Sequence, residues 1–187
     1  PDGGWTFRIT ELDKSHIYLD YINAMTYDMT DFHFTSHHTA PYSSTKGGNY
    51  TARSVKNSID IFKAKGIPPE KIIIGAAFYS KKWSGIKGGE NGLAAATEAP
   101  VAYGPGITAL EEEYINKNGF RRYWDETACA PYLYNGDTFI TYDDEESIKK
   151  KCELILEEDI GGIMVWELGG DRKQTLLPLM RKWLGNR

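Results

Sequence analysis

Three apolar runs, at residues 21–28, 71–79 and 161–167, limit what this chain can fold into. Each is rich in aliphatic residues, which is typical of strands buried in a parallel sheet. Their endings each combine an aromatic ring with polar groups: Tyr27 with Asp28, Tyr79 with Ser80, Lys81 and Trp83, and Trp166 with Glu167. The carboxyl ends of parallel strands meet at one rim, where ligands of α/β folds bind. We therefore expect one binding site, of a kind suited to a sugar.

Helical patterns separate these runs and indicate an α/β fold. Ile148, Cys152 and Ile155 are spaced to face the interior of one helix. The expected elements are, in order, a helix at 10–19 capped by Thr10, a strand at 19–27, a loop at 29–49, a helix at 51–65, a strand at 71–79, a helix capped by Asp143 with Glu146 at its third position, a strand at 161–167 and an outer helix at 171–184.

The segment at residues 84–141 interrupts this alternation. It is far longer than the few residues that usually connect a strand to its helix. We expect it to form a small α+β subdomain over the rim, while residues 1–83 and 142–187 form the main domain. Its expected elements are a helix at 109–117 and strands at 121–124, 130–134 and 138–142.

Bulk properties narrow the class of protein. The length of 187 residues suffices for one well-buried domain. A complete eight-stranded α/β barrel needs about 250 residues. A net charge of −4 argues against a nucleic-acid or anionic-membrane surface. No apolar run is long enough to span a membrane, and no signal peptide is visible. Cys152 lies on an apolar helix face, which favours a core thiol over a disulfide with Cys129.

The endings of the three runs also resemble a known family. Met25-Thr26-Tyr27-Asp28 resembles the M-x-Y-D motif on the sixth barrel strand of the family-18 glycoside hydrolases, the chitinase family. The run at 74–79 resembles the seventh strand, which usually ends Y-G-R. The run at 164–167 resembles the eighth strand, and Gly169-Gly170-Asp171 resembles the turn after it. The three motifs in this order are specific, whereas any one alone is weak evidence.

This resemblance implies the C-terminal half of a (β/α)8 TIM barrel, about strands six to eight. Segment 84–141 resembles the chitinase insertion subdomain, particularly at Arg122-Tyr123-Trp124-Asp125 and Pro131-Tyr132-Leu133-Tyr134. The family's general acid is the final Glu of a D-x-x-D-x-D-x-E motif on the fourth strand. Asp143-Asp144-Glu145-Glu146 and Asp125-Glu126 do not fit that spacing. We therefore expect a fragment of a longer enzyme, inactive alone, with its general acid outside this chain.

The resemblance also assigns roles to the strand endings. Family-18 enzymes depart from the two-carboxylate scheme of glycosidases because the substrate assists its own cleavage. The acetamido carbonyl of N-acetylglucosamine attacks the anomeric carbon, and Tyr27 is expected to hold that carbonyl in line. Asp28 is expected to accept a hydrogen bond from a sugar hydroxyl. Trp166 is expected to form the floor of the −1 subsite, with Glu167 beside it.

Further binding residues are expected around these. Tyr79 matches the family, but Lys81 replaces the usual Arg and lacks its planar fork, so its role as a partner of Asp28 or of the sugar stays open. Trp83 either lines an outer subsite or packs under the insertion. Met25 and Met164, each two residues before a site ring, are expected to pack beneath it.

The other polar clusters are expected to be solvated. His33, His37 and His38 lie in a loop without fixed geometry, which argues against a metal site. The acidic run at 111–113 is expected to form an exposed helix face.

These expectations add up to a secreted, retaining chitinase that cleaves β-1,4 bonds between N-acetylglucosamine units. Its partners are chitin and its oligosaccharides, not nucleic acid or membrane, and no metal or organic cofactor is implied. The open alternatives are an inactive chitinase-like lectin, a peptidoglycan- or endoglycosidase-type member of the family, and an acid–base pair of Asp28 and Glu167. Unpaired strand edges are expected to let this chain self-associate.

Overall fold

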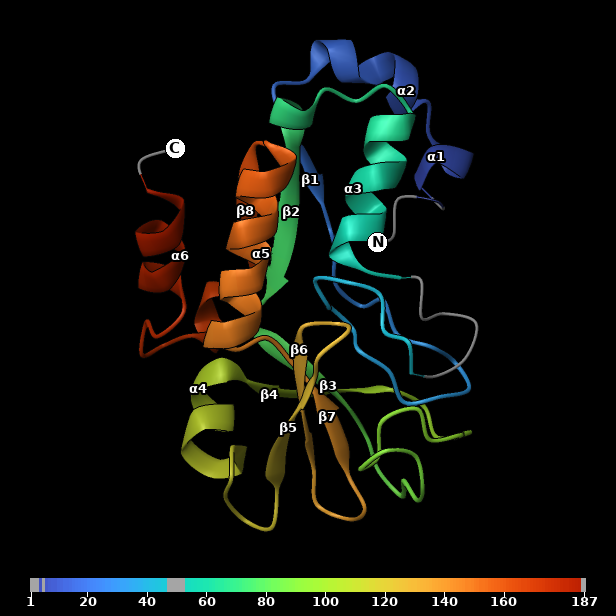
Figure 1. Ribbon diagram of the computed structural model, residues 1–187, viewed down its shortest axis with the longest axis vertical. Coiled ribbons are helices and arrows are strands. Elements are labelled where there is room, and N and C mark those ends of the chain that lie inside the picture. Colours follow the sequence, from blue (N-terminus) through green and yellow to red (C-terminus); the bar gives the residue numbers. More distant parts are fainter. Residues whose placement is uncertain (1–3, 5, 47–52, 186–187) are drawn as a thin grey trace.

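A computed structural model describes residues 4, 6–46 and 53–185 and contains two sheets (Figure 1). The first is a parallel sheet in the order β1-β2-β8, with strands Ile22–Ala24, Ile72–Ala77 and Gly162–Trp166. The second is an antiparallel sheet in the order β4-β3-β7-β6-β5, with strands Ala102–Gly106, Tyr79–Trp83, Phe139–Thr141, Ala130–Tyr134 and Arg121–Asp125. The fold is therefore mixed α/β.

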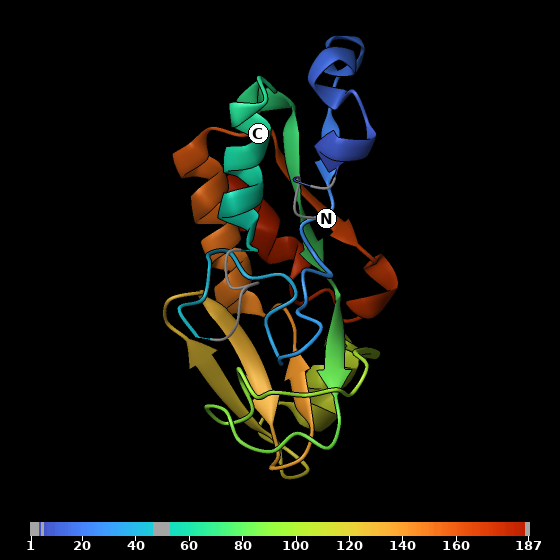
Figure 2. The ribbon, with the colours of Figure 1, turned by 90° about the vertical axis from the view of Figure 1, so that its right-hand side faces the viewer.

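Helices α3 (Val55–Ala64), α5 (Glu145–Glu158) and α6 (Leu177–Leu184) accompany the parallel sheet in the upper part of Figure 1. In Figure 2, α3 and α5 lie on one side of the strands. The core between them is mainly aliphatic, since β1 and β2 bury alternate residues against the two helices. The buried residues of this core are Ile22, Ala24, Val55, Ile59, Phe62, Ile67, Ile72, Ile74, Leu154, Ile155 and Ile160.

Local capping chemistry fixes where the two long helices begin. Ser54 caps α3, since its hydroxyl accepts a hydrogen bond from the backbone N–H of Asn57 at 3.1 Å. The expected cap of α5 was wrong by one residue. Asp144, not Asp143, accepts from the N–H of Ser147 at 3.1 Å, and Ser147 completes a capping box. Ile148, Cys152 and Ile155 are buried, as their spacing predicted.

The N-terminal part differs from the expectation of one helix followed by a long strand. Short helices α1 (Thr6–Ile9) and α2 (Leu12–Ser15) and the 3-10 turn η1 (His16–Tyr18) replace the helix. Thr10 caps neither, because its hydroxyl donates to the carbonyl of Thr6 and competes with helix continuation.

The expected strand at 19–27 and helix at 51–65 were also longer than the structure shows. Only Ile22–Ala24 form β1, and α3 starts at Val55; residues 47–52 lie outside the described part.

The outer helix also starts later than expected. The Asp171 carboxylate accepts from the backbone N–H groups of Thr175, Leu176 and Leu177 and so organises a loop. The helix α6 begins only after this loop, near Pro178, and it buries Met180.

The chain passes directly from β2 into the antiparallel sheet, with only Phe78 between β2 and β3. The expected strands at 121–124, 130–134 and 138–142 correspond to β5, β6 and β7. The expected helix at 109–117 is instead helix α4 (Ile107–Ala109) followed by a π-helical turn, Leu110–Tyr114. A separate core fills this sheet's underside and consists of Trp83, Ile86, Leu93, Ala95, Tyr132 and Phe139.

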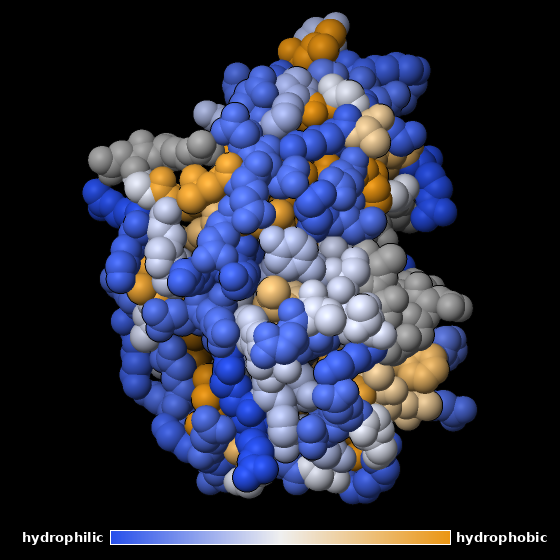
Figure 3. All heavy atoms as spheres, viewed as in Figure 1, coloured by the Kyte–Doolittle hydropathy of each residue, from blue (hydrophilic) through white to orange (hydrophobic). Residues whose placement is uncertain are grey.

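Hydrophilic residues cover most of the face that the helices present, and apolar atoms show mainly in the gaps between them (Figure 3). None of the described helices has the length and hydropathy of a membrane-spanning segment.

Candidate functional site

The register of the parallel sheet brings the strand endings to one rim. Ala24 pairs with Ile74, and Ala77 pairs with Trp166. The backbone N–H of Phe78 continues this ladder by donating to the Trp166 carbonyl at 2.7 Å. The carboxyl ends of β1, β2 and β8 therefore lie together, which is the rim where α/β folds bind ligands.

Tyr27 lies across the middle strand at Gly75. A Cβ placed on Gly75 would be 2.7 Å from the Tyr27 ring and 3.1 Å from the Met164 methyl group, so only glycine permits this packing. Burial, and then the negative charge of Asp28, raise the pKa of Tyr27, which keeps its hydroxyl protonated as a donor. Met164 was expected beneath Trp166, and its methyl group lies beside Gly75. Met25 was expected beneath the Tyr27 ring and is 52% exposed.

Two side chains hold Asp28 at one oxygen. Its Oδ1 accepts a hydrogen bond from the Tyr79 hydroxyl at 2.6 Å and lies 3.0 Å from Lys81 Nζ. His38 Nδ1 lies 3.8 Å from the same oxygen, which is beyond hydrogen-bond distance. A left-handed backbone, with φ at 59°, turns Asp28 toward these partners.

These contacts determine the charge states of Asp28 and Tyr79. Partial burial acts to raise the pKa of Asp28, but His38, Tyr79 and Lys81 outweigh it and leave the pKa well below its usual range. Burial and the bond to Asp28 raise the pKa of Tyr79 far above its usual range. Asp28 is therefore an anion that accepts hydrogen bonds, and Lys81 is its cation despite lacking the fork of an arginine.

The expectation of solvated loop histidines was wrong for His37 and His38, which are both buried. His37 Nε2 lies 3.2 Å from Asp125 Oδ2, and Ser44 donates to the same oxygen at 2.6 Å, so the loop after β1 folds onto the end of β5. Burial lowers the pKa of His38. Among the described residues no cluster of three metal-ligating side chains exists.

A buried ion pair beneath the site was not predicted. Lys151 Nζ on α5 lies 2.6 Å from Asp143 Oδ2 and donates to Thr39 Oγ1, also at 2.6 Å. The Thr39 hydroxyl in turn donates to the backbone carbonyl of Thr26, the residue before Tyr27. The Thr26 hydroxyl bonds both the N–H and the carbonyl of Gly75. One feature of the sequence indicated that Lys151 is buried: it lies in the apolar stripe of α5.

Of the remaining predicted site residues, two are exposed and one is buried in the second sheet. Trp166 is 58% exposed at the end of β8, Glu167 follows it as an exposed residue, and the peptide bond between them is cis. Trp83 is 2% exposed, and its ring centroid lies 5.8 Å from that of Phe139. Trp83 therefore packs inside the second sheet, which was one of its two expected placements. Cys129 and Cys152 are both free thiols.

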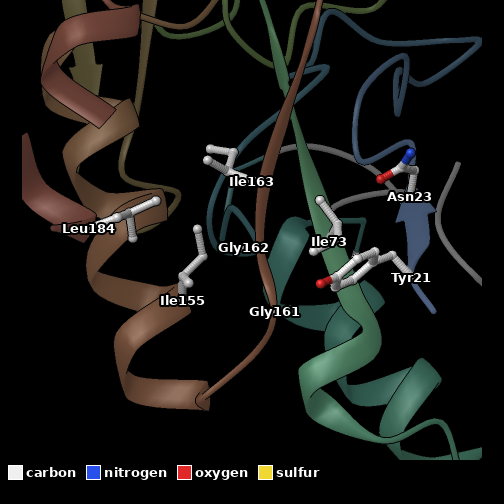
Figure 4. Close-up of a pocket in the computed structure, with 8 residues that line it drawn as sticks. All are labelled: Tyr21, Asn23, Ile73, Ile155, Gly161, Gly162, Ile163 and Leu184. Atoms are coloured by element: carbon white, nitrogen blue, oxygen red, sulfur yellow. The ribbon is translucent and has the colours of Figure 1, made fainter. Parts of the chain in front are cut away.

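A hollow of about 420 Å³ lies at the opposite, amino-terminal ends of the parallel strands (Figure 4). Tyr21 and Asn23 line it from the β1 side, and Ile155 and Leu184 from α5 and α6. None of the described residues that line it is charged, and this end of parallel α/β folds contributes to stability rather than chemistry. The candidate site is therefore the rim around Tyr27 and Asp28.

Comparison with known proteins identifies the family of this chain. Residues 1–171 match the model of the glycosyl hydrolases family 18. Chitinase A1 of Niallia circulans is 36% identical over 182 residues, which cover 89% of this chain and 26% of that protein.

Two solved structures are similar as well. A family-18 N-acetylglucosaminidase from Paenibacillus barengoltzii has a TM-score of 0.92 and 43% identity, covering 97% of this chain and 53% of that one. Chitinase ChiW from a Paenibacillus species, described as a cell-surface-expressed multi-modular enzyme, has a TM-score of 0.85 and 39% identity, covering 95% of this chain and 21% of that one.

This chain belongs to glycoside hydrolase family 18. It spans about a quarter of the length of Chitinase A1 and about half of the N-acetylglucosaminidase structure.

Proposed function

We propose that this chain is the sugar-orienting part of a retaining chitinase that acts by substrate assistance. Three parallel strands with helices on one side support its assignment to strands six to eight of a (β/α)8 barrel, in its C-terminal half. The five-stranded sheet supports the assignment of residues 84–141, entered through β3, to the chitinase insertion subdomain.

The observation that carries the proposal is that Tyr27, packed at Gly75, and Asp28, held by Tyr79, lie on the same rim as an exposed Trp166. Tyr27 keeps its proton and can donate to the acetamido oxygen of N-acetylglucosamine as that oxygen attacks the anomeric carbon. The apolar face of the sugar would pack on Trp166. Asp28 Oδ1 is already bonded to protein side chains, and Oδ2 would accept a hydrogen bond from a sugar hydroxyl.

Asp28 is a poor general acid, because its pKa is too low for it to carry a proton near neutral pH. This argues against an acid–base pair of Asp28 and Glu167. We place the general acid on a strand outside these 187 residues, as the family's fourth-strand motif implies. An intact protein without that Glu would bind chitin as a lectin.

The comparisons raise a second candidate within the same chemistry. The N-acetylglucosaminidase relative supports release of single sugars from chain ends, and the chitinase relatives support cleavage of chitin polymers. Chromatography of the early products released from an N-acetylglucosamine hexamer would distinguish the two.

The cell-surface description of ChiW supports an extracellular location.

The test is steady-state kinetics of the full-length enzyme on N-acetylglucosamine oligomers. Tyr27→Phe should lower kcat more than it raises KM, because its hydroxyl acts mainly in the transition state. Trp166→Ala should worsen both constants. Tyr21→Phe, on the opposite rim, is the control and should leave both unchanged. Wild-type kinetics in Tyr27→Phe would show that the site is elsewhere.

A further inference from the structure

Tyr27 and Asp28 lie in irregular backbone, because strand β1 ends at Ala24. Hydrogen bonds between strands therefore do not fix the positions of these two residues. A side chain takes over this part: the Thr26 hydroxyl accepts from the Gly75 N–H at 2.8 Å and donates to the Gly75 carbonyl at 3.0 Å. The residue before Tyr27 is thereby attached to the central strand.

Two consecutive residues of the loop after β1 hold both sides of this pair. The Thr39 hydroxyl donates to the Thr26 carbonyl at 3.0 Å, on the near side. The His38 carbonyl accepts from the Met29 N–H at 3.0 Å, on the far side. Thr39 and Thr26 are both buried, so water does not readily replace their bond when the Thr39 hydroxyl is lost.

Lys151 on α5 fixes the position of the Thr39 oxygen. Its fully buried ammonium donates to Thr39 Oγ1 and pairs with Asp143, both at 2.6 Å, and lies 3.5 Å from the Gly75 carbonyl. A threonine hydroxyl has one proton to donate. Since the oxygen accepts from Lys151, that proton is left for the Thr26 carbonyl. A path of hydrogen bonds therefore connects helix α5 to the residue before Tyr27.

We propose that Thr39, oriented by Lys151, is a positioning residue for Tyr27 and Asp28. This inference rests on the proposed function, in which the Tyr27 hydroxyl acts mainly in the transition state. A displacement of about 1 Å caused by a change away from the chemistry can cost about 10²-fold in rate. Loss of the Thr39 hydroxyl should therefore lower kcat, whereas sugar packing on Trp166, and with it KM, should change little.

The test is steady-state kinetics of the full-length enzyme on N-acetylglucosamine oligomers, with kcat referred to folded protein. Thr39→Val removes the hydroxyl, keeps the side-chain shape and leaves both members of the Lys151–Asp143 pair in place. It should lower kcat about 10- to 100-fold and change KM less than about twofold. Thr39→Ser keeps a hydroxyl and should retain most of kcat.

Ser58→Ala is the matched control for the loss of a buried hydroxyl. Ser58 is 1% exposed and donates to the Ser54 carbonyl at 3.0 Å within the first turn of α3. Its removal should leave kcat and KM unchanged, so any loss of stability that it shares with Thr39→Val is separated from an effect on catalysis.

A double variant tests the part assigned to Lys151. Lys151→Met, assayed at a temperature where it is folded, should lower kcat because Thr39 loses the donor that holds its oxygen. Combined with Thr39→Val, it should lower kcat no further than Thr39→Val alone, since both changes break one path. The Thr39 variants keep both charges of the ion pair and decide the inference even if Lys151→Met does not fold.

Several results would overturn the inference without touching the proposed function. These are wild-type kcat in Thr39→Val, equal losses in Thr39→Val and Thr39→Ser, or losses that multiply in the double variant, each found while Tyr27→Phe still lowers kcat. Wild-type kinetics in Tyr27→Phe would instead contradict the proposed function, and this inference with it.

Discussion

Replacing Lys151 by methionine tests whether the buried ion pair beneath the site holds the fold together. Methionine has a similar length, so packing in the helix α5 stripe is largely kept. The charge is not kept. Asp143 would remain fully buried, and its remaining donors among the described residues would be the Ala77 N–H at 3.1 Å and the Ser147 hydroxyl at 2.8 Å, because the Thr39 hydroxyl donates to the Thr26 carbonyl.

Removing one partner of a buried ion pair costs about 3–5 kcal/mol, because the other charge stays buried without compensation. At about 2–4 °C of Tm for each kcal/mol in a chain of this size, Lys151→Met should lower Tm by about 6–20 °C. Asp143→Asn combined with Lys151→Met should cost less than the sum of the two single changes, since neither charge remains.

Urea unfolding followed by circular dichroism measures these free energies. Lys150→Met is the matched control on the same helix. Lys150 is partly exposed and pairs with Glu153 at 2.8 Å, and a surface pair of this kind contributes about 0–1 kcal/mol. A Lys151→Met variant within about 1 kcal/mol of this control would refute the argument that the buried pair stabilises the fold.

The chain alone should not hydrolyse chitin oligomers measurably, since loss of a general acid usually costs about 10²-fold or more in rate; turnover that Asp28→Asn or Glu167→Gln abolishes would support the two-carboxylate mechanism instead. Because the fold lowers the pKa of Asp28, its charge stabilises the fold above about pH 4 and loses that effect as pH falls through the folded-state pKa. The difference in unfolding free energy between wild type and Asp28→Asn should therefore shrink between about pH 7 and 3, and a constant difference would contradict the low pKa. The outer edges of β1 and β8 have no strand partner among the described residues, so light scattering at micromolar concentration should show dimers or larger species; a stable monomer would contradict this.

The strand endings were predictable because they depend on local pattern. Aliphatic runs with a polar ending predict strands that deliver side chains to one rim, and the register of β2 with β8 brings Ala77 and Trp166 together as this reasoning requires. Gly75, inside the second run, also carried a usable signal, since a glycine in a strand marks the close approach of another group. The Tyr27 ring is that group.

The partners of these residues were not predictable, because they come from distant segments. His38 reaches Asp28 only because the loop after β1 folds onto the second sheet, where Asp125 holds His37. Asp143 and Asp144 are neighbours with opposite roles: one is buried against Lys151 and the other caps α5. Sequence spacing cannot tell them apart, because the choice depends on which carboxylate the Ala77 N–H and Lys151 can reach.

The second sheet is part of the site rather than a cover over it. Strand β3 starts with Tyr79 and continues to Lys81, and these two side chains hold Asp28. Only Phe78 separates β3 from the central parallel strand, so any shift of the antiparallel sheet would move the donors that set the charge and direction of Asp28. A change in β4 next to Lys81 should therefore alter the position of the Asp28 carboxylate. Lys81 stands where the resemblance to family 18 implies an arginine, and contacts with the cross-strand ring of Tyr103 and with the Asp28 carboxylate orient its ammonium in place of the planar fork.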